Sequence, residues 1–126
     1  MHALLLAAAI ATPGFHEAKA LEPAASFVAG KPVQVMCANS DASWHDFTTS
    51  HYGANVIIDL QGSAEVRGSQ LWLSPIACRY LNYGASAPLP TLNYPSLAPS
   101  INTLTHEAIH LRGESDEGVT ECDVYA

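Results

Sequence analysis

The chain has 126 residues, enough for one small domain with a single core and too few for two. Hydrophobic residues make up 48% of it, a share typical of globular proteins that excludes wholesale disorder. Twelve acidic side chains outnumber five basic ones, and the cations are scattered along the sequence. Binding to nucleic acid or to an anionic membrane needs grouped cations, so neither is expected as a partner.

The first twenty residues differ in composition from the rest. Ala3–Ala11 is an uninterrupted apolar run of signal-peptide length, too short to span a membrane. Ala18-Lys19-Ala20 has the small residues of a cleavage site, although Met1-His2 lacks the usual positive charge. We therefore predict a signal peptide over residues 1–20, a mature chain beginning near Leu21, and a secreted or extracytoplasmic protein. The alternatives are an uncleaved anchor and a buried apolar segment, and the alternative location is the cytoplasm.

Three cysteines, Cys37, Cys78 and Cys122, lack the CxxC spacing of a zinc knuckle or a thioredoxin motif. In an exported protein, two of them can form a disulfide and leave the third free. Three pairings are possible, and the sequence does not choose among them. The alternative is that all three cysteines are unpaired and buried as small hydrophobic side chains.

Residues 21–32 are expected to be a linker into a single domain over residues 33–126. Short apolar runs predict strands at Val33–Cys37, Val56–Leu60 and Gln70–Leu73. Turn residues flank the segment between the last two runs, which predicts a small antiparallel sheet.

The helical signals lie around and after these strands. Asn39–Tyr52 is either a short helix begun by Ser43 or a loop. Ser74-Pro75 begins a helix that runs to about Asn82, because serine caps helices and proline fits their first position. The four prolines in residues 84–99 predict a surface loop.

The next predicted helix runs from about Ser100 to Arg112 and ends at Gly113. Its apolar side chains recur at helical spacing and form a core face: Ile101, Leu104, Ala108 and Leu111. Ser115 begins a last helix that reaches the C-terminus. The whole pattern predicts an α+β fold, with a small antiparallel sheet packed on two to three helices.

The predicted helix from Ser100 contains His106-Glu107-Ala108-Ile109-His110. Histidines four residues apart lie on one helix face and can bind one zinc ion through both imidazoles. Glu107 is rotated about 100° from His106, which places its carboxylate beside a metal-activated water rather than on the metal. The spacing therefore matches a hydrolytic zinc site, and a solvated helix face with two ordinary histidines is the alternative.

A catalytic zinc site needs a third protein ligand, and the downstream candidates are Asp116, Glu117 and Glu121. The motif resembles that of the zincin metallopeptidases, most closely small gluzincin-like ones. That resemblance implies Glu117 as the third ligand and Glu121 as the residue that supports a ligand histidine. The spacing from His110 to Gly113 and Asp116 also resembles that of metzincins, which implies Asp116 as the ligand, but no methionine follows the motif. If the last helix folds back antiparallel, Glu121 lies nearest the metal.

These observations predict a zinc-dependent hydrolase, a metallopeptidase with Glu107 as general base. The metal, Zn²⁺, would be held by His106, His110 and Glu117, and the partner would be a peptide or protein substrate. The alternative is a catalytically inactive zincin-like binding or regulatory domain. A third possibility is a structural secreted domain without a metal.

Further residues have possible roles at such a site. An oxyanion stabiliser could come from His45, His51, Tyr52 or Tyr83. The strand Gln70–Leu73 is a candidate edge for pairing with an extended peptide.

Overall fold

The computed structural model of the chain describes residues 12–50, 56–58, 61–86 and 94–124. Five strands in this part form one sheet in the order β1-β2-β5-β4-β3. Their bounds are Phe15–Glu17 (β1), Gln34–Ala38 (β2), Val56–Ile58 (β3), Gly62–Glu65 (β4) and Gln70–Leu73 (β5).

The sheet is mixed, because β2 and β5 are parallel while the other neighbouring strands are antiparallel. Strands β3, β4 and β5 form the expected antiparallel unit, and β4 fills the segment between the two predicted strands. The α+β class is confirmed, and the parallel pair is the difference from the predicted sheet. Local sequence patterns indicate strands but do not say which strands become neighbours.

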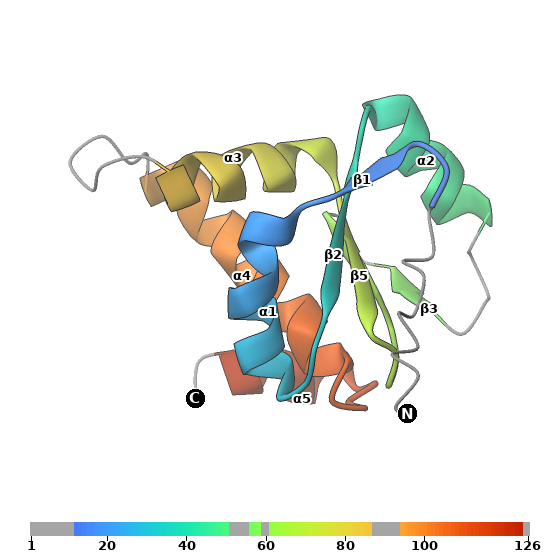
Figure 1. Cartoon of the computed structure of the whole chain (residues 1–126). Coiled ribbons are helices and arrows are strands. Elements are labelled where there is room, and N and C mark those ends of the chain that lie inside the picture. Colours follow the sequence, from blue (N-terminus) through green and yellow to red (C-terminus); the bar gives the residue numbers. More distant parts are fainter. Residues whose placement is uncertain (1–11, 51–55, 59–60, 87–93, 125–126) are drawn as a thin grey trace, which may run out of the picture.

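Five α-helices lie in the described part of the chain: α1 (Glu22–Ala29), α2 (Asp41–Ser50), α3 (Pro75–Ser86), α4 (Tyr94–His110) and α5 (Glu117–Val124). Helices α1, α3, α4 and α5 lie on one side of the sheet, and α2 lies on the other (Figure 1). The domain therefore has three layers, in which α4 packs on β4 and β5 and contacts each of the other three helices of its side.

The two faces of the sheet have separate cores, which follow from the alternation of side chains along β2 and β5. Val35, Cys37, Leu71 and Leu73 belong to the core under α1, α3 and α4. Met36 and Trp72 point the other way and pack with Phe47 of α2. Trp44 is partly buried and lies against this second core, with its ring stacked on that of Phe47.

Residues 12–32 belong to the folded domain. Strand β1 pairs with β2, and Ala18 and Leu21 are buried in the core. The expected linker is instead helix α1, whose Glu22 accepts a hydrogen bond from the backbone N–H of Val35 at 2.9 Å. Residues 1–11 of the predicted signal peptide lie outside the described residues. Cleavage after Ala20 would remove β1 from the sheet.

A disulfide joins Cys37 of β2 to Cys78 of α3, and Cys122 on α5 is free and exposed. The bond links the sheet to the helical layer and is typical of proteins that fold outside the reducing cytosol. Among the described helices, none has the length and apolarity needed to cross a membrane.

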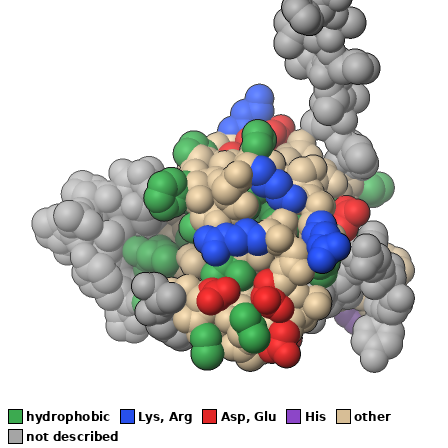
Figure 2. All heavy atoms as spheres, turned by 90° about the horizontal axis from the view of Figure 1, so that it is seen from below, with side chains coloured by type: hydrophobic (Ala, Val, Ile, Leu, Met, Phe, Trp, Pro, Cys, Tyr) green, Lys and Arg blue, Asp and Glu red, His purple; other side chains and the backbone are tan. Residues whose placement is uncertain are grey.

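The fold brings together three cations that are distant in the sequence. Lys31 donates a hydrogen bond to the backbone oxygen of Arg67, and Arg112 donates one to the backbone oxygen of Val28. Figure 2 views the molecule from this end and shows Lys and Arg side chains with acidic side chains beside them. The face has mixed charge, and two of these cations make tertiary contacts: Lys31 with the β4–β5 turn and Arg112 with helix α1.

Candidate metal centre

Helix α4 carries the HExxH motif and begins earlier than expected, at Tyr94 instead of Ser100, with Pro99 inside it. Leu104, Ala108 and Leu111 are buried as predicted, but Ile101 is 49% exposed. The helix ends at His110, and Gly113 follows with φ 105°, a backbone conformation that glycine adopts without strain. The turn at Gly113 allows α5 to pack against the end of α4 that carries the histidines.

The three polar residues of the motif are buried together with its two apolar ones. His106 is 9% exposed, and both Glu107 and His110 are 0% exposed. Polar groups are costly to remove from water unless they have partners. These three side chains therefore do not lie on a solvated helix face, which was the alternative to a metal site.

The Nε2 atoms of the two histidines converge on the carboxylate of Glu117, the first residue of α5. His106 Nε2 lies 2.7 Å from Glu117 Oε2, and His110 Nε2 lies 3.0 Å from Glu117 Oε1. The two Nε2 atoms are 3.1 Å apart. Two imidazoles and a carboxylate thus face a common point, as one metal ion requires.

The opposite nitrogen of each ring has a partner of its own. His106 Nδ1 lies 2.8 Å from Glu121 Oε2, and His110 Nδ1 lies 2.6 Å from the backbone oxygen of Glu114. Both acceptors favour a proton on Nδ1, which leaves the Nε2 lone pair for the centre. The contact with Glu121 was expected from the resemblance. The contact with Glu114 was not, because the sequence does not show which backbone oxygens reach a side chain.

Asp116 has a different role from the one that metzincin spacing implies. Its Oδ1 accepts a hydrogen bond from the backbone N–H of Val119 at 2.9 Å, and its backbone oxygen accepts one from the Thr120 hydroxyl. Asp116 therefore caps the first turn of α5, the position predicted for Ser115. Of the three candidate ligands, Glu117 is the one that lies against both Nε2 atoms.

The donors fit zinc in kind and in spacing. Two imidazole nitrogens and a carboxylate oxygen are a ligand set of hydrolytic zinc enzymes. Ligands about 2.0–2.1 Å from a tetrahedral zinc ion lie roughly 3.3 Å from one another. The separations of 2.7–3.1 Å among these atoms are close to that value, and small outward shifts would reach it.

Glu107 lies on the side of α4 that faces the sheet. Its Cγ and Oε1 occupy the space beside Gly62 of β4, where a Cβ atom would be 2.7 Å and 3.0 Å from them. The absence of a side chain at position 62 lets the helix carry a carboxylate at this interface. The sequence motif gave no indication of this contact, because it depends on a strand distant in the chain.

A cavity of about 330 Å³ adjoins the centre. Its lining combines residues of α4 and α5 with the residue that precedes β4: Gln61, Pro99, Asn102, Thr103, His106, Glu107 and Glu121. The amide of Asn102 lies 3.5 Å from Glu121 Oε1, so the cavity wall is continuous with the residues that hold His106. Amide, hydroxyl and carboxylate groups give the cavity the donors and acceptors that a polar substrate needs.

Several predicted contributors lie elsewhere. His45 is on α2, across the sheet from α4, so it cannot act as the oxyanion stabiliser. Strand β5 lies between β2 and β4 and offers no free edge for a peptide. His51 and Tyr52 lie outside the described residues, as does the side chain of Tyr83.

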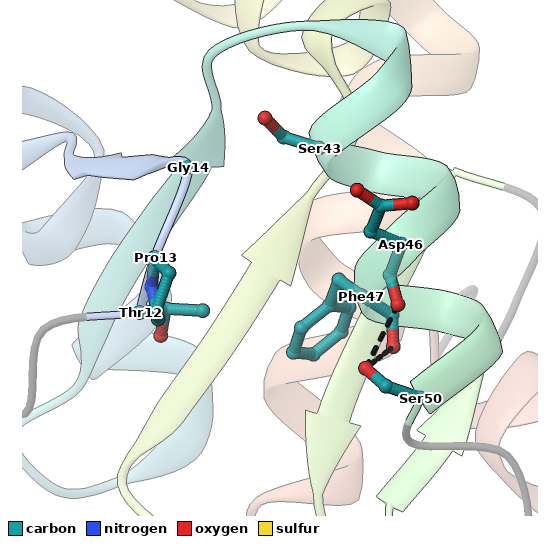
Figure 3. Close-up of a pocket in the computed structure, with 7 residues that line it drawn as sticks. All are labelled: Thr12, Pro13, Gly14, Ser43, Asp46, Phe47 and Ser50. Atoms are coloured by element: carbon teal, nitrogen blue, oxygen red, sulfur yellow. Dashed lines mark hydrogen bonds between the residues drawn. The ribbon is translucent and has the colours of Figure 1, made fainter.

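A second cavity, of about 420 Å³, lies between the start of β1 and helix α2. Asp46, Phe47 and Ser50 line it from the helix, opposite Thr12 and Pro13 (Figure 3). The Ser50 hydroxyl donates to the backbone oxygen of Asp46 at 2.8 Å. This cavity shares no lining residue with the one beside α4.

Comparisons of the chain with protein-family models, with curated proteins and with solved structures found no match.

Proposed function

We propose that this protein is a zinc-dependent hydrolase that acts on peptides, with His106, His110 and Glu117 as the metal ligands. The observation that carries the proposal is the convergence of the two Nε2 atoms on the Glu117 carboxylate. The Nδ1 atoms of the same two rings contact Glu121 and the Glu114 backbone oxygen, so the orientation of both rings is fixed. A merely structural histidine pair has no need of this arrangement. The adjacent cavity supplies room for a substrate.

Each residue has a separate task in this reaction. When bound, zinc activates water towards proton loss and polarises the substrate carbonyl. Glu107 accepts the proton of the attacking water at its carboxylate and later delivers it to the leaving amine nitrogen. Glu121 and the Glu114 backbone oxygen keep the imidazole rings oriented. The disulfide supports a site of action outside the reducing cytosol.

Metal analysis of the purified full chain tests the ligands. We expect about one zinc per chain after supplementation at neutral pH, and less than roughly a tenth of that in His106→Ala and His110→Ala. The matched control is His45→Ala, because His45 is exposed on α2 and should leave the zinc content unchanged. Equal zinc content in all four proteins would disprove the proposed ligands.

Hydrolysis of a fluorogenic peptide library tests the reaction. Glu107→Gln should lose nearly all activity while it keeps its zinc, because the amide cannot accept the proton. Glu65→Gln, at an exposed position of β4, is the control and should match the wild type. Zinc binding without hydrolysis in the wild type would favour the alternative, a zincin-like binding or regulatory domain.

A further inference from the structure

Gly62, the first residue of β4, is buried against the α4 helix at the level of Glu107. A Cβ atom built on it would lie 2.7 Å from Glu107 Cγ, 2.9 Å from Thr103 Cγ2 and 3.0 Å from Glu107 Oε1. Real Cβ atoms essentially never approach other heavy atoms below 3.0 Å. Any other residue at position 62 would therefore force the Glu107 side chain, Thr103 or the helix itself to move.

The glycine has this effect because β4 holds it in place. Gly62 pairs with Leu73 of the central strand β5, and Leu73 is fully buried. The strand cannot easily yield, so the strain of an added methyl group falls on α4. Ala64, two residues along the same face, is also 0% exposed, and there the sheet accommodates a methyl group in the apolar core. Gly62, in contrast, lies where α4 places the carboxylate of Glu107 against the strand.

We propose that Gly62 is a positioning residue, which sets the place of the Glu107 carboxylate relative to the metal ligands; this role rests on the proposed function of Glu107 as general base. None of the three closest approaches to the new Cβ atom involves a proposed metal ligand. A methyl group at position 62 should therefore disturb proton transfer and leave metal binding intact.

Gly62→Ala is the first test. We expect the variant to bind zinc with wild-type stoichiometry and to lose about 100-fold in kcat, because a general base displaced by about 1 Å loses its alignment with the reacting water. KM should change much less than kcat. Gly68→Ala, in the β4–β5 turn, is the matched control: the three atoms nearest its new methyl group all belong to the side chain of Glu65, so kcat should stay within twofold of the wild type. Loss of zinc from Gly62→Ala, or unchanged kcat, would overturn the proposal.

A second test measures the contact without any activity. Glu107→Ala removes both the Cγ and the Oε1 atoms that the new methyl group would meet. The loss of Tm caused by Gly62→Ala should therefore be at least halved when Glu107 is already alanine. An equal loss in the two backgrounds would show that Gly62 does not position Glu107.

The double variant Gly62→Ala, Thr103→Ser separates positioning from packing. Serine removes the methyl group that lies 2.9 Å from the new Cβ and keeps a hydroxyl for the backbone oxygen of Pro99. We expect Tm to recover in part while kcat stays low. Recovery of kcat together with Tm would assign the effect to packing alone and overturn the proposal. If the wild type hydrolyses no peptide, the proposed function fails. The comparison of Tm losses in the wild-type and Glu107→Ala backgrounds still shows whether residue 62 contacts Glu107.

Discussion

At the scale of single residues, the geometry of the metal centre depends on the hydrogen-bond partner of the Nδ1 atom of each histidine. An imidazole can present either nitrogen, and the partner of the other nitrogen decides which one is available. Here Glu121 and the Glu114 backbone oxygen engage the Nδ1 atoms, so both Nε2 atoms face Glu117. The affinity for zinc should therefore depend on residues that do not touch the metal.

Glu121→Gln tests this dependence. The neutral amide is a weaker acceptor for the Nδ1 proton of His106, so the Kd for zinc should rise about 10- to 100-fold. Competition with a chromogenic chelator measures it. Glu114→Gln is the control, because the backbone oxygen and not the side chain engages His110. Unchanged affinity in Glu121→Gln would show that its contact with His106 contributes nothing to zinc binding.

At the scale of elements, helix α5 is attached mainly through polar groups. Its one buried side chain is Thr120, while Glu117 and Glu121 reach back to α4. Asp116 caps the helix, which makes the capping residue important for the placement of Glu117.

Two substitutions at Asp116 distinguish a cap from a metal ligand. Asparagine is an equally good cap, so Asp116→Asn should keep both the wild-type stability and the zinc. Asp116→Ala should lower the free energy of unfolding by about 1 kcal/mol and weaken zinc binding. Urea denaturation and zinc titration measure these effects. If Asp116→Asn lost its zinc while it stayed folded, Asp116 would be a ligand after all.

Strand β1 is the element that the predicted cleavage after Ala20 would remove. A chain that starts at Leu21 would leave the β2 edge unpaired and take Phe15 from its contact with Phe47, where the ring centroids are 5.2 Å apart. We expect a lower urea midpoint for that chain than for one that starts at Thr12 and keeps β1. Equal midpoints would show that β1 adds nothing to stability. N-terminal sequencing of the mature protein would show whether the chain is cleaved and at which residue.

At the scale of the whole molecule, the disulfide between Cys37 and Cys78 joins the sheet to the helical layer that carries the centre. It closes a loop with a sequence separation of 41 residues, which contains β3, β4 and β5. A cross-link of this span restricts the unfolded chain. In the folded protein the bond fixes α3 to β2 and so holds the helical layer on the sheet. The contact of α4 with β4 depends on that packing.

Replacing both cysteines by alanine should lower the free energy of unfolding by about 3–4 kcal/mol. Cys122→Ala should have little effect, because Cys122 is exposed and free. Guanidinium denaturation of the three proteins in the absence of reductant gives the comparison. A double variant as stable as the wild type would mean that the cross-link does not contribute to stability.

The sequence by itself determined the features that depend on neighbours along the chain. The spacing of His106 and His110 places them on one helix face, and Ser74 begins α3 by accepting a hydrogen bond from the backbone N–H of Ala77. The short apolar runs form strands. These features follow from the periods of 3.6 and 2 residues, which local composition reveals.

Only the tertiary structure decided which distant residues meet. The choice of Glu117 among three acids depends on how α5 turns back at Gly113, and the pairing of Cys37 with Cys78 depends on α3 lying over β2. The parallel pairing of β2 with β5 and the place of Gly62 beneath Glu107 likewise join segments far apart in the chain. The physical reason is that packing selects these contacts from many that local propensity permits equally.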